Sequence, residues 1–114
     1  MSKSLGNLYE DRVSKYLTKK GFDIVARNYH SRFGEIDIIA SKGNKLVVIE
    51  VKGGKDIKKL SQRVDCKKLK KIILTFQDWL DKNYLYTDFE QIFVAALVEG
   101  EKITFRRIYL EDCF

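Results

Sequence analysis

Residues that commonly cross-link chains or bind metals are scarce in this sequence of 114 residues, which contains one histidine and two cysteines. Cys66 and Cys113 have neither the CxxC spacing of a zinc site nor histidines clustered around them. We therefore expect no structural zinc site and no disulfide framework. Two reduced thiols are typical of a cytosolic protein, so the sequence predicts a cytoplasmic location.

Long hydrophobic runs are also missing. The longest, residues 92–98, has seven residues, whereas a membrane-spanning helix needs about 18. The first residues carry no apolar stretch like that of a signal peptide, so we expect neither secretion nor membrane contact. There is no proline, no internal repeat and no low-complexity tract, and the length is that of one domain, 1–114.

What the chain has in excess is positive charge. It carries 22 Lys and Arg against 16 Asp and Glu, which gives a net charge of +6. Such an excess favours a polyanionic partner, because neutralising phosphates releases condensed counterions. Many basic proteins bind no nucleic acid, so the charge alone does not identify the partner.

The hydrophobic pattern predicts an α/β fold with the element order α-β-β-β-α-β-β. Apolar residues recur at helical spacing over residues 4–20 and 60–80. Runs rich in apolar and β-branched residues predict strands over residues 22–29, 35–40, 46–52, 91–98 and 103–110. Some strands are joined by hairpins and others by a helical crossover, so we expect a mixed sheet with helices packed on its faces.

The second and third predicted strands bring acidic residues together. If the turn between them centres on Gly43-Asn44, the numbers of paired residues sum to 87, which places Asp37 opposite Glu50. The two-residue period of a strand puts Lys52 on the same face. Like charges so close destabilise a sheet, and a divalent cation between them would remove that penalty. Magnesium suits such a site because it takes one or two carboxylates together with water and phosphate oxygens.

The same alternation predicts that Ile36, Ile38, Ile49 and Val51 share the opposite face of this hairpin. The alternative interpretation of the charged face is a solvated salt-bridge ladder in which Glu35 pairs with Lys52. We favour a site, because the acidic residues interrupt otherwise apolar strands that should be covered.

Further candidate residues lie outside the hairpin. Glu10 lies at the edge of the apolar stripe of the first helix and would complete the surroundings of a metal; a solvated position is the alternative. Lys68 and Lys71 lie on the polar face of the second helix, and Arg32 lies in the turn before the second strand. These three are candidate nucleic-acid contacts, with a solvated surface as the alternative.

Several of these residues carry a family resemblance. Asp37 followed by Glu50-Val51-Lys52, with a helical Glu10 before them, resembles the PD-(D/E)xK nuclease superfamily of restriction enzymes and Holliday-junction resolvases. The blocks Gly34 to Ala40 and Ile49 to Lys52 more closely resemble the YraN family, a widespread group of small bacterial proteins described as endonuclease-like. Gly6, Gly21-Phe22, Arg27-Asn28 and the helix pattern Val64, Lys68, Lys71-Ile72 also follow that family.

The resemblance implies a three-layer α/β/α core like that of restriction endonucleases, which cleaves phosphodiester bonds of DNA with Mg²⁺ or Mn²⁺. By that pattern Asp37 and Glu50 are metal ligands, Lys52 activates the attacking water, and Glu10 is an auxiliary ligand. Lys68 would face the substrate from the helix. Branched or otherwise structured DNA is the expected substrate.

The sequence departs from the pattern at three positions. Ile36 replaces the proline of the superfamily, Val13 replaces a usual alanine, and Gly54 stands where an arginine commonly follows. The last change removes one expected phosphate contact. A second hypothesis is therefore a module that binds nucleic acid or a partner, keeps the nuclease fold and does not cut. A third is a homodimer that spans both strands of a duplex.

Overall fold

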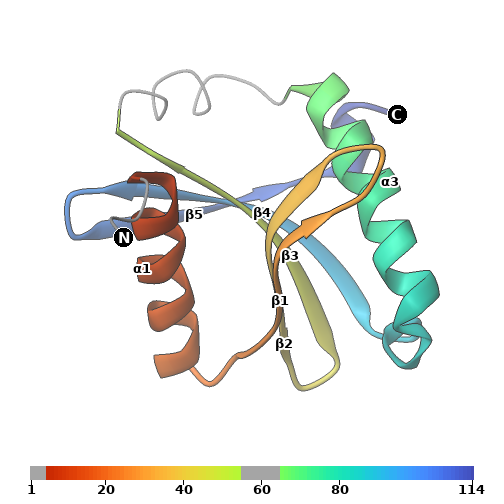
Figure 1. Ribbon diagram of the computed structural model, residues 1–114, viewed down its shortest axis with the longest axis horizontal. Coiled ribbons are helices and arrows are strands. Elements are labelled where there is room, and N and C mark those ends of the chain that lie inside the picture. The colour runs from red at the N-terminus through yellow and green to blue at the C-terminus, as the bar shows by residue number, and fades with distance from the viewer. Residues whose placement is uncertain (1–4, 55–64) are drawn as a thin grey trace.

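The computed structural model describes residues 5–54 and 65–114 (Figure 1). Within these ranges the order of helices and strands is the predicted α-β-β-β-α-β-β. The part of the second predicted helix before residue 65 lies outside the described residues. The elements are α1 (Leu5–Lys19), β1 (Asp23–His30), β2 (Glu35–Lys42), β3 (Lys45–Gly53), α3 (Cys66–Lys82), η2 (Tyr84–Tyr86), β4 (Glu90–Glu99), β5 (Lys102–Ile108) and η3 (Leu110–Asp112).

The five strands form one mixed sheet in the order β1-β2-β3-β4-β5. The neighbours β1 and β2, β2 and β3, and β4 and β5 are antiparallel, whereas β3 and β4 are parallel. The parallel pair requires a crossover, and α3 lies within it. The prediction of a mixed sheet is therefore confirmed.

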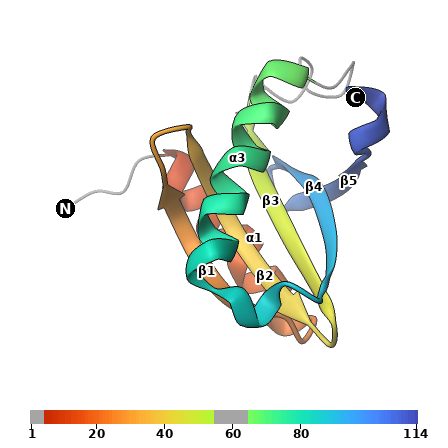
Figure 2. The same ribbon diagram turned by 90° about the vertical axis from the view of Figure 1, so that its right-hand side faces the viewer.

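The two helices lie on opposite faces of the sheet, as Figure 2 shows with α3 in front and α1 behind. Each face has its own buried core, which confirms the predicted three layers. On the α1 side the buried residues are Val13, Leu17, Ile38, Ala40, Val47, Ile49, Ala96 and Val98. On the α3 side they are Ile36, Ile39, Leu46, Val48, Ile72, Phe76, Trp79 and Phe93. No helix in the described ranges is long and apolar enough to cross a membrane.

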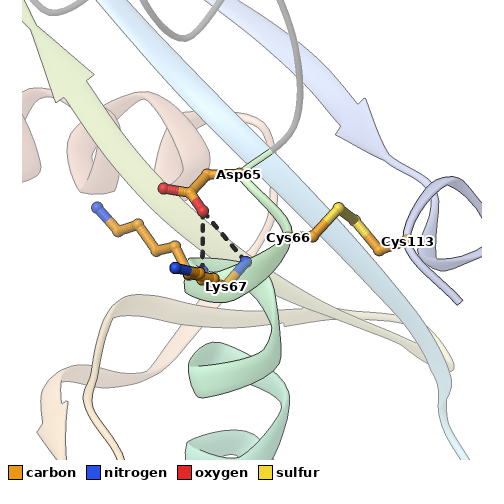
Figure 3. The surroundings of a disulfide bond; sticks show 5 residues. Asp65, Cys66, Lys67 and Cys113 are labelled. Carbon is orange, nitrogen blue, oxygen red and sulfur yellow. Dashed lines mark hydrogen bonds between the residues drawn. A yellow bond between two sulfur atoms is a disulfide. The ribbon is translucent and has the colours of Figure 1, made fainter.

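Local sequence signals explain the helix ends. After α1 the chain turns at Gly21, whose φ of 90° is a conformation that glycine adopts without strain. Asp65 caps the start of α3, and its side chain accepts hydrogen bonds from the backbone N–H groups of Lys67 and Lys68 (Figure 3). This cap fixes the first turn of α3, the turn that carries Lys68.

The expectation of two reduced cysteines is wrong. Cys66 and Cys113 form a disulfide bond, with their Cα atoms 5.5 Å apart (Figure 3). The two residues are separated by 47 positions in the sequence, so no spacing motif announces the bond. The fold brings them together because the chain after β5 returns to the beginning of α3. The disulfide thus ties the C-terminal segment to the helix that follows β3.

The predicted register of the β2–β3 hairpin is confirmed near the turn. Lys42 pairs with Lys45, and the pairing continues up to Ile38 with Ile49, always with the sum of 87. No β2–β3 pair is formed beyond that point in the described structure. From there β2 continues beside β1 and β3 continues beside β4. The two central strands therefore part, and the candidate site lies where they do so.

The parting also corrects one expectation about side-chain faces. Ile38 and Ile49 belong to the core on the α1 side, and Val51 packs against it, as predicted. Ile36 was expected with them but lies in the core on the α3 side. The regular alternation assumed for the hairpin applies only while β2 and β3 remain paired, and Ile36 lies beyond the last pair.

Candidate functional site

Asp37 lies where β2 and β3 part, and its side chain spans the gap. Its Oδ2 accepts a hydrogen bond of 2.7 Å from the backbone N–H of Val51. Asp37 and Glu50 therefore do not face each other as a ladder pair, because the side chain of Asp37 occupies the place of the missing backbone pair. The carboxylate is held by backbone and is half-buried, so its position is well defined.

The charge on Asp37 is poorly compensated. Burial raises the pKa of the Asp37 carboxyl above its usual value, and the nearby charges of Glu50 and Glu35 raise it further. The hydrogen bond from Val51 and the charge of Lys68 lower the pKa but do not offset these effects. Because its pKa is raised, the ionised Asp37 carboxylate costs free energy in the folded state. A proton or a cation bound at this carboxylate would remove that cost.

Glu50 follows on β3, and its side chain is only 12% exposed. Its Oε1 forms an ion pair with Lys52 at 3.4 Å and a second one with Lys68 from α3. Burial opposes the charge on Lys68, but its hydrogen bonds together with the negative charges of Glu50 and Asp37 outweigh burial, so the pKa of Lys68 is raised. The sequence predicted these three residues as site residues, and the structure brings them into contact.

The alternative salt-bridge ladder is not what forms. Glu35 contacts His30 at 3.6 Å, and the described residues show no ion pair between Glu35 and Lys52. Lys52 is only 24% exposed and lies beside Glu50. The charged face is therefore a partly buried cluster and not a solvated row.

Glu10 approaches from the other face of the sheet. It is 8% exposed, and its Oε1 is buried with no hydrogen-bond partner among the residues that the structure describes. The guanidinium of Arg27 lies 4.0 Å from this oxygen but only 2.9 Å from Asp11. Burial raises the pKa of Glu10, and the charge of Asp37 raises it further. A buried carboxylate oxygen without a partner is rare and requires an explanation.

These residues line a single cavity of about 640 Å³. The lining includes most of the predicted site residues, namely Glu10, Asp37, Glu50, Lys52, Lys68 and Lys71. Arg32 is not part of the lining; its guanidinium lies 4.8 Å from the centre of the Phe33 ring on an exposed turn. The structure therefore groups six of the seven predicted residues and leaves Arg32 outside.

The carboxylates of the cavity limit which cation could bind there. Among the described residues no three of His, Cys, Asp and Glu lie close enough together to hold a metal ion. Lys68 and Lys52 already contact Glu50, whereas the charges of Asp37 and Glu10 are only partly compensated, by Val51 and Lys68 and by Arg27 and Asn28. Two carboxylates are enough for Mg²⁺, which completes its coordination with water and phosphate oxygens. The residues present therefore fit a weakly held magnesium or manganese ion.

Comparison with known proteins gives a family. A profile of the uncharacterised protein family UPF0102 matches residues 9–103. The chain belongs to the UPF0102 family. A UPF0102 protein of Sulfurimonas denitrificans is 42% identical over 103 residues, which cover 90% of this chain and 93% of that protein. A UPF0102 protein of Campylobacter jejuni is 48% identical over 85 residues, which cover 75% of this chain and 76% of that one.

The segment that matches UPF0102 contains the whole charged cluster. It begins one residue before Glu10 and extends past Lys71 to residue 103. Cys113 lies beyond that limit, so one half of the disulfide is outside the UPF0102 match.

Two close contacts around the UPF0102 cavity were not predicted from the sequence. A side chain added at Gly53 would lie 2.4 Å from the ring of Tyr9, so α1 approaches the backbone of β3 there. A Cβ added at Gly34 would lie 3.4 Å from Cβ of Lys71, so α3 approaches the turn before β2. Gly6, which the sequence pattern singled out, lies where side-chain surroundings are not described. The Gly53-Gly54 pair at the end of a strand is the signal that indicates the first contact.

Proposed function

We propose that this UPF0102 protein is a metal-dependent nuclease that hydrolyses phosphodiester bonds of DNA, including branched or structured DNA. The observation that carries the proposal is the pair of poorly compensated buried carboxylates, Asp37 and Glu10, in one cavity with Lys52 and Lys68. A buried negative charge of this kind favours a cation, and cations in turn bind phosphate.

Asp37 and Glu50 would hold Mg²⁺ or Mn²⁺, with Glu10 as the auxiliary ligand. When bound, the ion would polarise a phosphate oxygen and lower the pKa of a water molecule. Asp37 contributes a fixed position, because the backbone N–H of Val51 orients its carboxylate. Glu50 would contribute its carboxylate in competition with Lys52 and Lys68, which both contact its Oε1 in the structure.

Lys52 and Lys68 are the cationic groups nearest to these carboxylates. Lys52 is half-buried beside Glu50, where it can orient a water molecule for attack on phosphorus and stabilise the charge that develops. Lys68 and Lys71 line the cavity from α3 and would bind the phosphates that enter it. Arg32 lies outside the cavity, so its proposed role is limited to a flanking phosphate.

The finer family assignment supports this function. The Gly34 to Asp37 block and Glu50-Val51-Lys52 resemble the YraN and PD-(D/E)xK pattern, in which these acidic residues and the lysine carry the chemistry. The α/β/α layers and the central position of the parting strands agree with such a core. The basic net charge belongs to the same proposal, whereas the Cys66–Cys113 disulfide removes the ground on which a cytoplasmic location was expected.

The test is cleavage of labelled single-stranded, flapped and four-way DNA in Mg²⁺ and in Mn²⁺. Asp37→Asn and Glu50→Gln should each reduce the rate by roughly 100-fold or more, because each removes a charge needed in the transition state. Asp23→Asn is the matched control, since Asp23 is an exposed carboxylate at the opposite end of the β2 register and outside the cavity. Equal cleavage by wild type and both site variants would overturn the assignment.

A second candidate function is binding without cleavage. The observation in its favour is that Lys68 and Lys52 already neutralise Glu50, so the cluster is stable as an internal ion-pair network. This function predicts DNA binding that persists in EDTA, a steep dependence of affinity on salt, and no product with either metal. The same cleavage experiment, run beside a binding titration, separates the two functions.

A further inference from the structure

Asn28, within β1, has a backbone conformation that is unusual for a strand. Its φ is 51°, and no other non-glycine residue in the described ranges has a positive φ. Residues of a strand have φ near about −120° to −140°, and the left-handed region costs free energy for any residue with a Cβ. Glycine, which occupies the other positive-φ positions 21, 43, 54 and 100, adopts it without that cost. A side chain at position 28 therefore requires an explanation.

The left-handed residue changes the face to which the side chains of β1 point. Arg27 lies 2.9 Å from Asp11 of α1. Tyr29, two positions further on, donates a hydrogen bond to Asp78 of α3, on the opposite face of the sheet. Residues two apart in a regular strand share a face, so the backbone of Asn28 accounts for the change. Glycine would serve this purpose equally well, so the turn does not explain the side chain.

Asn28 lies across from Asp37. The neighbouring pairs join residues 27 and 38 and residues 29 and 36, and between them Asn28 and Asp37 stand opposite each other without forming a pair. Asp37 has no partner on β3 either, within the described part of the chain. The irregularity of β1 therefore coincides with the point where β2 and β3 part, which is the point where the carboxylate of Asp37 lies.

The side chain of Asn28 also reaches Glu10. Burial raises the pKa of the Glu10 carboxyl most, whereas the charge of Arg27 and a side-chain hydrogen bond from Asn28 lower it. Oε1 of Glu10 is still buried without a hydrogen-bond partner in the described ranges. Asn28 itself does not line the cavity, whereas Glu10 and Asp37 both do. The amide therefore contacts the carboxylate from outside the cavity.

We propose that Asn28 is a positioning residue of the site, whose side-chain amide orients the Glu10 carboxylate for the ion that Glu10 and Asp37 would bind. This inference rests on the proposed function and adds a residue to its site. A carboxylate that ligates a metal is itself commonly held by a hydrogen bond, and loss of such a partner typically costs about 10- to 100-fold in metal affinity. The strained backbone of Asn28 is retained, on this view, because glycine would lack the amide.

The first test measures the contact without any metal. In ¹⁵N-labelled protein the side-chain amide resonances of Asn28 should shift when Glu10→Ala removes the acceptor. Asn83 is the matched control, because its side-chain amide donates a 2.8 Å hydrogen bond to the backbone oxygen of Trp79 and should not respond. Asn28 resonances that are unchanged in Glu10→Ala would overturn the inference.

The second test separates the amide from the backbone. Asn28→Gly keeps a left-handed conformation without strain and removes the amide, so the variant should be as stable as wild type but bind Mn²⁺ about tenfold more weakly in calorimetry. The double variant with Glu10→Ala should bind no more weakly than Glu10→Ala alone, because Asn28 acts through Glu10. Asn44→Gly, an exposed turn residue outside the cavity, is the control and should leave Mn²⁺ affinity unchanged.

The outcomes distinguish this inference from the proposed function. Equal Mn²⁺ affinity of wild type and Asn28→Gly would overturn the positioning role and leave the metal site intact. Additive losses in the double variant would show that Asn28 acts independently of Glu10, which also contradicts the inference. A wild type that binds no Mn²⁺ would overturn the proposed function together with the role of Asn28 in it.

Discussion

Lys68, on the first turns of α3, forms an ion pair with Glu50, on the third strand of the sheet, and this pair connects the helix layer to the charged residues that line the cavity. The contact raises the pKa of Lys68 despite the burial that opposes its charge. Glu50 has a second cation, Lys52, at 3.4 Å. A metal ion bound at Glu50 would therefore compete with Lys68 for the carboxylate, and a substrate phosphate would bind Lys68.

Removal of Lys68 should have opposite effects on two ligands. Lys68→Met frees Glu50 from one competing cation, so Mg²⁺ affinity should rise by a few-fold, whereas affinity for single-stranded DNA should fall. The pair is partly exposed, so the loss of folding stability should be about 1 kcal/mol or less. Calorimetry with Mg²⁺ and a DNA-binding titration measure the two effects. Lys70→Met, on the exposed face of the same helix, is the control, and a variant with weaker Mg²⁺ binding would contradict the prediction.

Asp37 should reduce stability when no cation is bound. Burial raises the pKa of its carboxyl, so the ionised form costs free energy in the folded state at neutral pH. Asp37→Asn keeps an oxygen that accepts the hydrogen bond from Val51 and removes the charge. The variant should therefore melt at a higher temperature than wild type in EDTA, and the wild type alone should gain stability from added Mg²⁺. A lower melting temperature for the variant in EDTA would show that the charge is already compensated.

The disulfide should contribute strongly to stability. A cross-link between Cys66 and Cys113, separated by 47 positions, reduces the entropy of the unfolded chain. For a loop of that length the contribution is roughly 4 kcal/mol. Urea unfolding of wild type with and without dithiothreitol should show this difference, and Cys113→Ser should be insensitive to the reductant. Coincident unfolding curves for the wild type, with two thiols alkylated in the non-reduced protein, would refute the bond.

The group of Tyr29, Asp78 and Lys82, none of which lines the cavity, should respond to pH. The hydroxyl of Tyr29 donates a hydrogen bond to Asp78, which holds the pKa of Asp78 below its usual value, and Lys82 contributes at 3.3 Å. A carboxyl with a lowered folded-state pKa stabilises the protein above its unfolded-state pKa, and this stabilisation is lost as the pH falls through the folded-state value. Tyr29→Phe should raise the pKa of Asp78, as measured by NMR titration. Its stability deficit relative to wild type should vanish in acid.

Some of this structure follows from local sequence signals. The register of the β2–β3 hairpin near the turn follows from the two-residue turn at Gly43-Asn44, which is a local signal. The same signal places Asp37, Glu50 and Lys52 in one neighbourhood, as observed. The raised pKa of Glu10, in contrast, depends on how α1 packs against the sheet, which its helical periodicity does not specify.

The features that escaped prediction depend on tertiary packing. The strands part after Ile38 and Ile49 because each continues beside a different neighbour, and the sequence of the hairpin does not specify those neighbours. The Cys66–Cys113 bond depends on the return of the chain after β5 to the start of α3. Arg32 was expected at the site because of its charge, but it does not line the cavity and lies against the ring of Phe33.

The close approach of Tyr9 to Gly53 has a consequence for the history of these sequences. Because any side chain at position 53 would overlap the tyrosine ring, the two positions are not free to vary independently. A relative that acquires alanine or serine at the position of Gly53 should carry a smaller residue at the position of Tyr9. If the tyrosine is replaced by a smaller residue first, position 53 can then accept a side chain. Aligned relatives should therefore show correlated substitution at these two positions.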